Sequence, residues 1–403
     1  MEFPLTSLQK ATQIGTKQHN KRLVLRVIYD QGEISRADIA RITHLTRTTV
    51  SNVVSSLMAE GLVAEMGQGP SAGGKPPTLL HVVDDARQII GIDLANRELQ
   101  GGVFDLRGRM QHHVSMTADR SDGRILLAQV YDLIEQLQAL ADRPLLGIGV
   151  GTPGLMNVDE GFIYDAIHLN WHDLPLRDLL QSRYNLPIYV VNNSQAAALA
   201  QFLFGNPQKA TSLIVVKAGR GTSAGIVLNR RLFLGSNHSG ASEIGHLQVV
   251  EGGEPCVCGH FGCLETVASS RALIRWARSV ATVNPASQLN QFVDAPAEIT
   301  TDTLLLAFQA GDPDLNRAIV RAGRYLGTAV GNLVTAFNIP LVYIAGSLSR
   351  FGDTLLDPIR EEMHQRAYVR LAETTQIEIS QLGQDIVMLG AASLLLMNEL
   401  GVV

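Results

Sequence analysis

Residues 35–65 read SRADIARITHLTRTTVSNVVSSLMAEGLVAE, and this stretch determines the fold of the N-terminal part of the chain. Ser35 begins a helix-capping pattern in which Asp38 stands where Glu or Gln is usual. Thr46 is placed to cap the next helix, and Gly61 is expected to end it. The apolar stripe of this second helix comprises Val50, Val53, Val54 and Leu57. Two short helices joined by a tight turn predict a helix-turn-helix.

The segments on either side complete the same domain. Residues 20–29 place apolar side chains on one face of a preceding helix. Residues 62–65 begin a strand, residues 67–77 are rich in Gly, Pro and Ser, and residues 78–80 are typical of a returning strand. Three helices and a two-stranded hairpin predict a winged helix-turn-helix within residues 1–83.

The polar face of the third helix is suited to DNA. Opposite the apolar stripe it carries short donors and acceptors and one cation: Arg47, Thr48, Ser51 and Asn52. A helix in the major groove needs such groups to reach base edges and phosphates. Lys75 puts a cation at the tip of the wing, from which it can enter an adjacent minor groove. We expect these residues to contact double-stranded DNA, although a solvated surface or a protein-binding wing would have a similar face.

The charge is distributed unevenly. Residues 1–80 contain nine Lys/Arg and six Asp/Glu, a formal charge of +3, whereas the rest of the chain contains 24 basic and 32 acidic residues, a charge of −8. A basic module on an acidic body fits a nucleic-acid contact at one end of the molecule.

A different pattern begins after a short linker at residues 84–87. A meander of strands, a helix and a further apolar strand are expected over residues 89–94, 101–105, 110–116, 123–141 and 145–151. Strand and turn patterns return between residues 213 and 234. A strand meander followed by a helix and a parallel strand, with a related pattern further on, predicts two related α/β lobes.

The bulk composition excludes other classes of protein. The chain has 403 residues, of which 46% are hydrophobic, so it can form several cores. It has no apolar run of about 18 residues, which argues against a membrane span. Residues 1–10 lack the apolar segment of a secretory signal. We therefore expect a cytoplasmic protein.

All three cysteines lie close together, at Cys256, Cys258 and Cys263. An odd number of clustered thiols favours metal binding over a disulfide framework. Gly259 and Gly262 would let the chain fold around a small ion. A closed tetrahedral zinc site needs a fourth ligand, for which His246 and His260 are both candidates. The alternative is a group of reduced thiols without a metal.

The residues around this cluster resemble a known family. The segment Glu243-Ile244-Gly245-His246, followed by Cys256-x-Cys258-Gly-x-x-Gly-Cys263-Leu-Glu265, closely resembles the ROK family of bacterial repressors and sugar kinases. The resemblance extends over the whole chain. It implies an actin-like, ribonuclease-H-like two-lobed ATPase fold. It also implies one structural zinc, with His246 as the fourth ligand.

The resemblance implies a division into a first lobe and a second lobe. The first lobe would comprise residues 88–194 plus 381–403, and the second, with the zinc site, residues 195–380. Family members bind a hexose between the lobes, and the matching residues here are Asn192, Asn193, Glu243, His246, Glu265 and His168. Carboxylates and amides can pair with vicinal sugar hydroxyls. The family often has Asn where His168 stands.

Three departures from the kinase members indicate that the sugar-binding body does not catalyse phosphorylation. Asn193 occupies the position of the catalytic Asp, and an amide cannot take a proton from a sugar hydroxyl. The first phosphate loop of the kinases, Asp-x-Gly-x-Thr, is Asp93-Leu94-Ala95-Asn96-Arg97 here, without its Gly and Thr. The second glycine loop has Ser223 where the kinases usually have Gly.

These observations together predict a transcriptional regulator, most simply a repressor of carbohydrate genes. Its effector would be a sugar or a sugar phosphate, and a two-fold operator would require a homodimer or homotetramer. Two alternatives remain. One is a sugar kinase with a DNA-binding extension, and the other is a regulator whose sensor binds a protein partner.

Overall fold

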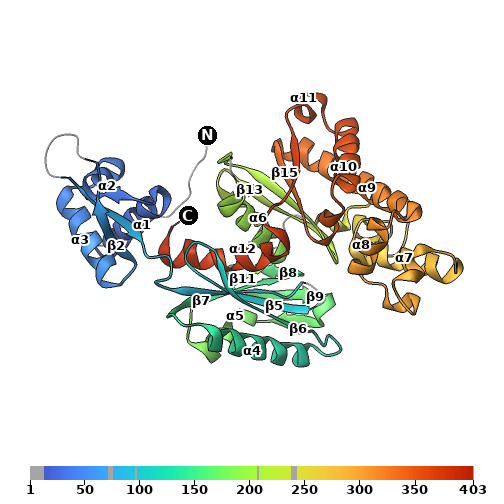
Figure 1. The fold of residues 1–403 in the computed structure, drawn as a ribbon, viewed down its shortest axis with the longest axis horizontal. Coiled ribbons are helices and arrows are strands. Elements are labelled where there is room, and N and C mark those ends of the chain that lie inside the picture. Colours follow the sequence, from blue (N-terminus) through green and yellow to red (C-terminus); the bar gives the residue numbers. More distant parts are fainter. Residues whose placement is uncertain (1–12, 71–75, 96–97, 207, 237–242, 403) are drawn as a thin grey trace.

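The computed structural model describes residues 13–70, 76–95, 98–206, 208–236 and 243–402. The chain forms a small N-terminal domain and a two-lobed α/β body (Figure 1). Among the described helices, none has the length and apolar character needed to cross a membrane.

The N-terminal domain is a winged helix, as expected. Its elements are, in chain order, α1 (Gln13–Gln31), β1 (Ile34–Ser35), α2 (Arg36–Thr43), α3 (Arg47–Ala59), β2 (Val63–Gln68) and β3 (Thr78–Val82). Both predicted caps form, because the Ser35 side chain accepts from the Asp38 N–H and the Thr46 side chain accepts from the Thr49 N–H. The sheet order is β1-β3-β2. The first helix is longer than expected, and the two-residue strand β1 was not predicted.

The first lobe is built on a sheet of order β11-β7-β4-β5-β6. Its strands and outer helices are β4 (Gln88–Asp93), β5 (Glu98–Phe104), β6 (Met110–Thr117), α4 (Gly123–Leu140), β7 (Leu145–Thr152), α5 (Leu176–Tyr184) and β11 (Ile188–Asn192). A small separate sheet contains β8 (Leu155–Asn157), β9 (Phe162–Ala166) and β10 (Trp171–Leu174). β4 pairs in parallel with β7 and antiparallel with β5. The meander, helix and parallel strand expected for this region are therefore present.

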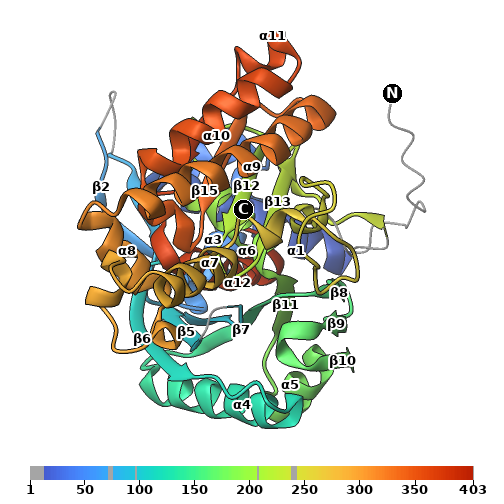
Figure 2. The same cartoon turned by 90° about the vertical axis from the view of Figure 1, so that its right-hand side faces the viewer.

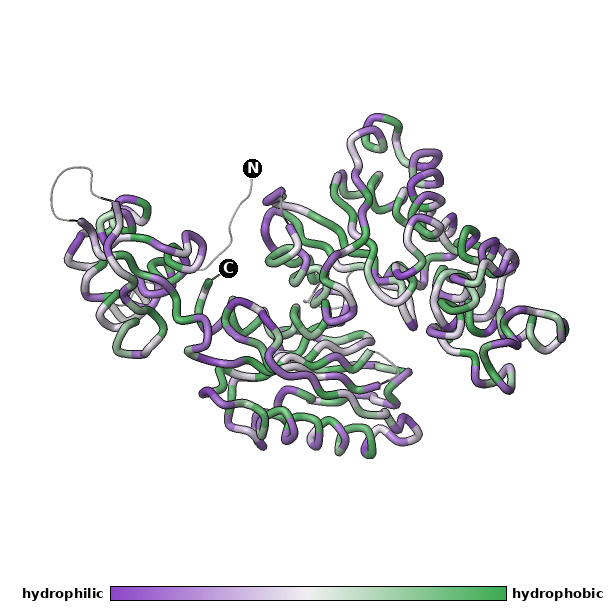
Figure 3. Tube along the Cα trace, in the orientation of Figure 1, coloured by the Kyte–Doolittle hydropathy of each residue, from purple (hydrophilic) through white to green (hydrophobic). Residues whose placement is uncertain are grey.

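The second lobe repeats this architecture with more helices. Its sheet has the order β14-β13-β12-β15-β16. Its elements are β12 (Leu213–Ala218), β13 (Thr222–Leu228), β14 (Arg231–Leu232), α7 (Ser270–Val283), α8 (Thr301–Gln309), α9 (Pro313–Phe337), β15 (Leu341–Ala345), α10 (Asp353–Arg366), α11 (Val369–Ala372) and β16 (Gln376–Ile379). Figure 2 shows α9 and α10 side by side, and Figure 3 shows that the central strands are mostly hydrophobic.

Two helices fill the space between the sheets, namely α6 (Asn193–Phe204) and α12 (Ile386–Leu395) (Figure 1). A Cβ atom at Gly149 of β7 would lie only 2.0 Å from the carbonyl oxygen of Ala391 in α12. A Cβ at Gly225 of β13 would lie 2.0 Å from the carbonyl oxygen of Ser194 in α6. Because both helices touch strand backbone, glycine is required at these positions.

The N-terminal domain is joined to the body by specific contacts. The Tyr29 hydroxyl donates to the Leu106 carbonyl at 2.8 Å, and the Arg107 guanidinium lies 4.2 Å from the centre of the Tyr29 ring. Arg107 also pairs with Asp84 at 2.8 Å. Arg22 of α1 donates to the carbonyl of Asn398, which follows α12. These contacts join the N-terminal domain both to the first lobe and to the segment that follows α12.

Candidate functional site

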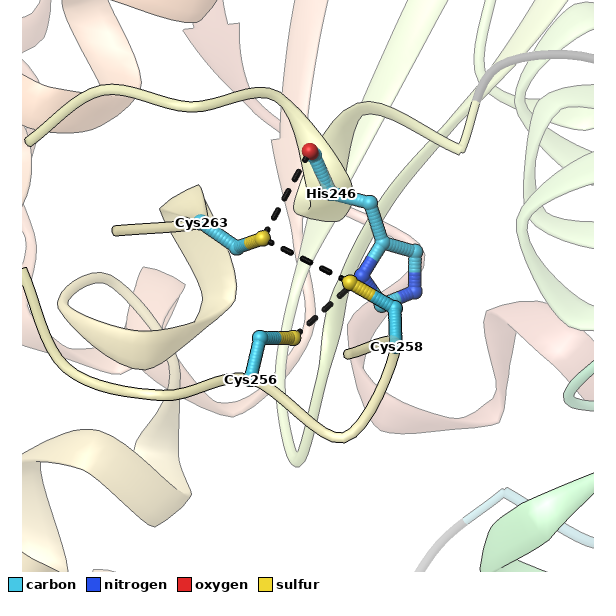
Figure 4. A group of neighbouring side chains, drawn as sticks. All are labelled: His246, Cys256, Cys258 and Cys263. Atoms are coloured by element: carbon cyan, nitrogen blue, oxygen red, sulfur yellow. Dashed lines mark hydrogen bonds between the residues drawn. The ribbon is translucent and has the colours of Figure 1, made fainter. Parts of the chain in front are cut away.

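The structure gathers one histidine and all three cysteines at one point (Figure 4). The possible ligand atoms of His246, Cys256, Cys258 and Cys263 all lie within 4.8 Å of one another. The Cys256 sulfur is 3.5 Å from Nδ1 of His246, and the Cys258 and Cys263 sulfurs are 3.6 Å apart. The latter distance is far longer than a disulfide bond.

The loop that carries the thiols depends on its two glycines. Gly259 has φ of 89° and Gly262 has φ of 70°, both in the region that disfavours other residues. A Cβ at Gly262 would lie 1.7 Å from the Val250 carbonyl oxygen. His260, the other candidate ligand, is exposed and lies outside the four-residue cluster. The geometry therefore favours His246.

Two distances within the cluster fit a tetrahedral ion. Zinc with bonds of about 2.3 Å to sulfur and about 2.0–2.1 Å to nitrogen would place its ligand atoms roughly 3.5–3.8 Å apart. The two contacts given above agree with this spacing. The four residues could therefore hold a metal ion.

A partly buried carboxyl group lies beside the first lobe. Glu243 precedes the short helical turn Ile244–His246, and its Oε1 accepts a hydrogen bond of 3.4 Å from the Asn192 amide. Asn192 ends β11 and caps α6, with its Oδ1 accepting from the Ser194 N–H at 2.9 Å. Burial, followed by the charge of Glu265, raises the pKa of Glu243 to about 7. Near neutral pH this carboxyl group can therefore either donate to or accept from a hydroxyl.

Glu265 connects this carboxylate to the thiol cluster. Its Oε1 lies 3.7 Å from the Cys256 sulfur. It belongs to the short helical turn Leu264–Thr266, immediately after Cys263. Glu265 is therefore in direct contact with the thiol loop.

Asp93 and Asn193, two of the positions compared with kinase machinery, are buried at the end of β4 and just after β11, whereas Ser223 lies within β13 and is partly buried. Asn193 begins α6 and is 8% exposed. Burial raises the pKa of Asp93, although the ammonium group of Lys217 and a hydrogen bond from the Ala95 N–H favour the carboxylate. Asn96 and Arg97, the end of the altered loop, lie outside the described residues.

His168 lies in a strongly basic environment that was not predicted from the sequence. Arg271 is 2.7 Å from its Nε2. Burial lowers its pKa to about 4, and the charges of Arg271, Arg220 and Arg120 act in the same direction. The signal that could have revealed the arginines is the helical spacing of Arg271, Arg275 and Arg278.

The low pKa of His168 predicts how stability depends on pH. In the unfolded chain this histidine becomes protonated as the pH falls below 6.5. In the folded chain it stays neutral until about pH 4. This part of the stability is therefore present above pH 6.5 and is lost as the pH falls toward 4. Between pH 7 and 5 the wild type should lose about 1–2 kcal/mol more than His168→Asn. Urea denaturation at both pH values measures the difference, and parallel losses would contradict the prediction.

The proposed DNA-contacting side chains share one surface of α3. The residues are Arg47, Thr48, Ser51 and Asn52, and all of them are exposed. The opposite face, with Val50 and Leu57 fully buried, packs into the domain core. Lys75 lies outside the described residues. The arrangement leaves the polar face of α3 open to a partner.

Comparisons with known proteins agree with both parts of the molecule. A sequence model of the ROK family matches residues 89–398, and a model of the MarR family matches residues 19–69. The chain therefore belongs to the ROK family. It carries a MarR-type DNA-binding domain in front of the ROK domain.

Individual relatives are of two kinds. The xylose repressor of Caldicellulosiruptor bescii is 34% identical over 389 residues, covering 95% of this chain and 97% of its own. The glucokinase of Halalkalibacterium halodurans is 33% identical over 318 residues, covering 78% of this chain and 96% of its own. The crystal structure of a ROK family transcriptional regulator, a homologue of the E. coli MLC protein, has a TM-score of 0.82 at 26% identity and covers 96% of this chain and 98% of its own. The two regulators span nearly all of this chain, whereas the glucokinase matches a shorter part.

Proposed function

We propose that this protein is a cytoplasmic, sugar-responsive repressor of carbohydrate genes. One observation carries the proposal: a single chain contains both a winged helix and a two-lobed body. The winged helix presents an open polar face on α3, and in the body Glu243 contacts Asn192. The named xylose repressor supports it, because that relative covers both parts. The proposed domains are residues 1–83, 88–194 plus 381–403, and 195–380.

The sugar or sugar phosphate would bind between the lobes. Its hydroxyl groups would contact Glu243, Glu265, Asn192 and Asn193, with His246 and His168 at the edge of the same region. A ligand can favour one spacing of the lobes only if it binds that conformation more tightly than the other. The resulting coupling free energy is typically about 1–3 kcal/mol. The contacts of Arg22 and Tyr29 would pass the change to paired winged helices in a homodimer or homotetramer.

We assign a structural zinc to His246, Cys256, Cys258 and Cys263. Four protein ligands leave no open position, so the ion would fix the loop and would not activate water. The Nδ1 atom of His246 faces the thiols, so Nε2 could donate to a sugar hydroxyl. The loop in turn would hold Glu265 in place.

DNA binding is tested through α3. Arg47→Ala should weaken operator binding and flatten its salt dependence by about one unit of slope, because one phosphate contact is lost. Arg370→Ala, which removes an exposed arginine from α11, is the matched control. Electrophoretic mobility shift or fluorescence anisotropy with the chain's own operator measures both. If Arg47→Ala bound the operator with the same affinity as the wild type, Arg47 would not be part of the DNA interface.

The kinase alternative has support from the similarity to the glucokinase, and it is tested directly. We expect no phosphorylation of a hexose panel in a coupled ATP assay, because Asn193 cannot act as a base. Asn193→Asp alone should not restore activity, since the altered loop at Asp93 remains. Turnover by the wild type above about 1 s⁻¹, within the usual range of enzymes, would establish the kinase instead.

The other alternative is a regulator whose sensor domain binds a protein partner. Isothermal titration with neutral sugars tests it, because only a sugar sensor should bind them and release heat.

A further inference from the structure

A small pocket lies where four parts of the chain meet, away from the contacts assigned to the sugar. These parts are α1 of the winged helix, α6, the hairpin of β13 and β14, and the helical turn Leu396–Leu400 that follows α12. The volume of the pocket is about 150 Å³. An apolar cavity of similar size holds one benzene ring. The pocket can therefore accept a group of that size.

The floor of this pocket is apolar. Six hydrophobic side chains line it, namely Leu199, Phe202, Leu203, Val227, Leu232 and Met397. Leu199 and Val227 are buried, and the other four are partly buried against the same hydrophobic core. An apolar group placed on this floor would be removed from water, which favours binding.

The rim of the pocket is basic. Three arginines line it, Arg26 of α1, Arg230 of the turn and Arg231 of β14, and the described residues of the lining include no carboxylate. Arg26 lies 3.7 Å from the carboxylate of Asp30, at the long end of the range for an ion pair. Arg230 and Arg231 are exposed, so an anion can reach them from solvent. The rim therefore favours a negatively charged group above the apolar floor.

The turn between β13 and β14 holds one of these arginines in an unfavourable backbone conformation. Asn229 and Arg230 form a two-residue turn, with φ angles of 51° and 65°. Such turns prefer Asn at the first position and Gly at the second, so an arginine at the second position is strained. The guanidinium group of Arg230 lies 5.6 Å from the centre of the Phe202 ring in the pocket lining. Backbone strain that persists beside a pocket is typical of a residue with a function in binding.

We propose that this pocket binds a small monocarboxylate whose apolar part is about the size of one ring. The apolar part would lie on the floor, and the carboxylate would lie at the rim, where a planar guanidinium group can bind both of its oxygens. A neutral sugar does not suit the pocket, because its hydroxyl groups would face hydrocarbon without hydrogen-bond partners. The site goes beyond the proposed sugar response, since it shares no residue with the contacts of Glu243 and Asn192. An occupant would touch both the winged helix, through Arg26, and the second lobe, through Arg231.

Calorimetry on the full-length protein tests the site. Benzoate is titrated, and we expect saturable binding with a dissociation constant of about 1 mM or lower, as is usual for a ligand of this size. Arg231→Gln should weaken binding by about tenfold, the usual effect of losing a charge-assisted hydrogen bond. Leu203→Trp fills the pocket without changing its charge and should abolish binding. Arg370→Gln removes the same charge from an exposed position on α11 and should bind like the wild type.

Arg230→Gly separates a role in binding from a structural one. Glycine adopts the φ of this turn without strain, so the midpoint of thermal unfolding should stay the same or rise. The affinity for benzoate should nevertheless fall by about tenfold, because the charge is lost. An arginine with only a structural role would leave the affinity unchanged.

Two further compounds define the ligand class. Hexanoate tests whether the apolar part is a chain or a ring, and the tighter of the two carboxylates gives the answer. Benzylamine has the ring of benzoate with the opposite charge and should not bind. The proposal is overturned if neither carboxylate binds saturably, if benzylamine binds as tightly as benzoate, or if the two arginine variants bind like the wild type. Retained operator binding shows that each variant is folded, and none of these results depends on the response to neutral sugars.

Discussion

Cys258→Ser is expected to abolish stoichiometric metal binding and to lower the free energy of unfolding by about 3–5 kcal/mol, because a structural metal contributes directly to folding. The Cys258 sulfur contacts that of Cys263 at 3.6 Å, and serine is a poor ligand for a thiophilic ion. Elemental analysis should find one zinc per wild-type chain and none in the variant. Thermal unfolding with and without a chelator measures the energetic effect.

His260→Ala is the control for this experiment. His260 belongs to the same loop but is exposed and outside the cluster, so metal content and stability should not change. Purified wild-type protein without stoichiometric metal would contradict the zinc assignment. In Cys258→Ser, sugar affinity should also fall, because the loop positions Glu265 next to Cys256.

Glu243→Ala should weaken sugar binding by about 100-fold or more, since two hydrogen bonds to a charged or polarised carboxyl group would be lost. The probes are D-xylose, glucose and N-acetylglucosamine, with affinity measured by calorimetry. Glu251→Ala removes an exposed carboxylate from a neighbouring segment and should bind like the wild type. Operator binding by Glu243→Ala should persist, which separates a local loss from misfolding. If Glu243→Ala bound the sugar as tightly as the wild type, Glu243 would not be a sugar-binding residue.

Much of the fold could be predicted because local signals agreed with it. Ser35 and Thr46 cap their helices as the spacing indicated, and the hydrophobic runs of β4, β7 and β12 are buried strands. The small sheet β8-β9-β10 was not predicted, because its strands are short and mix polar with apolar residues. β1 has only two residues and exists through its pairing with Leu80, a contact that no local pattern contains.

In the candidate site, too, features formed by neighbouring residues could be predicted, whereas contacts between distant segments could not. The Cys256 to Cys263 spacing is local, so the thiol cluster could be predicted from residues alone, whereas the choice of His246 needed the family resemblance. The contact of Arg271 with His168 joins residues far apart in sequence, and nothing in either segment indicates it.

The packing of α12 also determines the order in which the molecule can be completed during synthesis. Residues 88–192 supply every strand of the first lobe, yet Gly149 in the middle of that sheet packs against Ala391 near the far end of the chain. The core of the winged helix is also continuous with that of the first lobe and of the segment that follows α12. The first lobe cannot complete its folding until α12 has been synthesised, and until then the apolar surface that α12 covers is exposed. A ribosome-bound chain stalled before residue 386 should therefore recruit chaperones and be sensitive to protease in the first lobe.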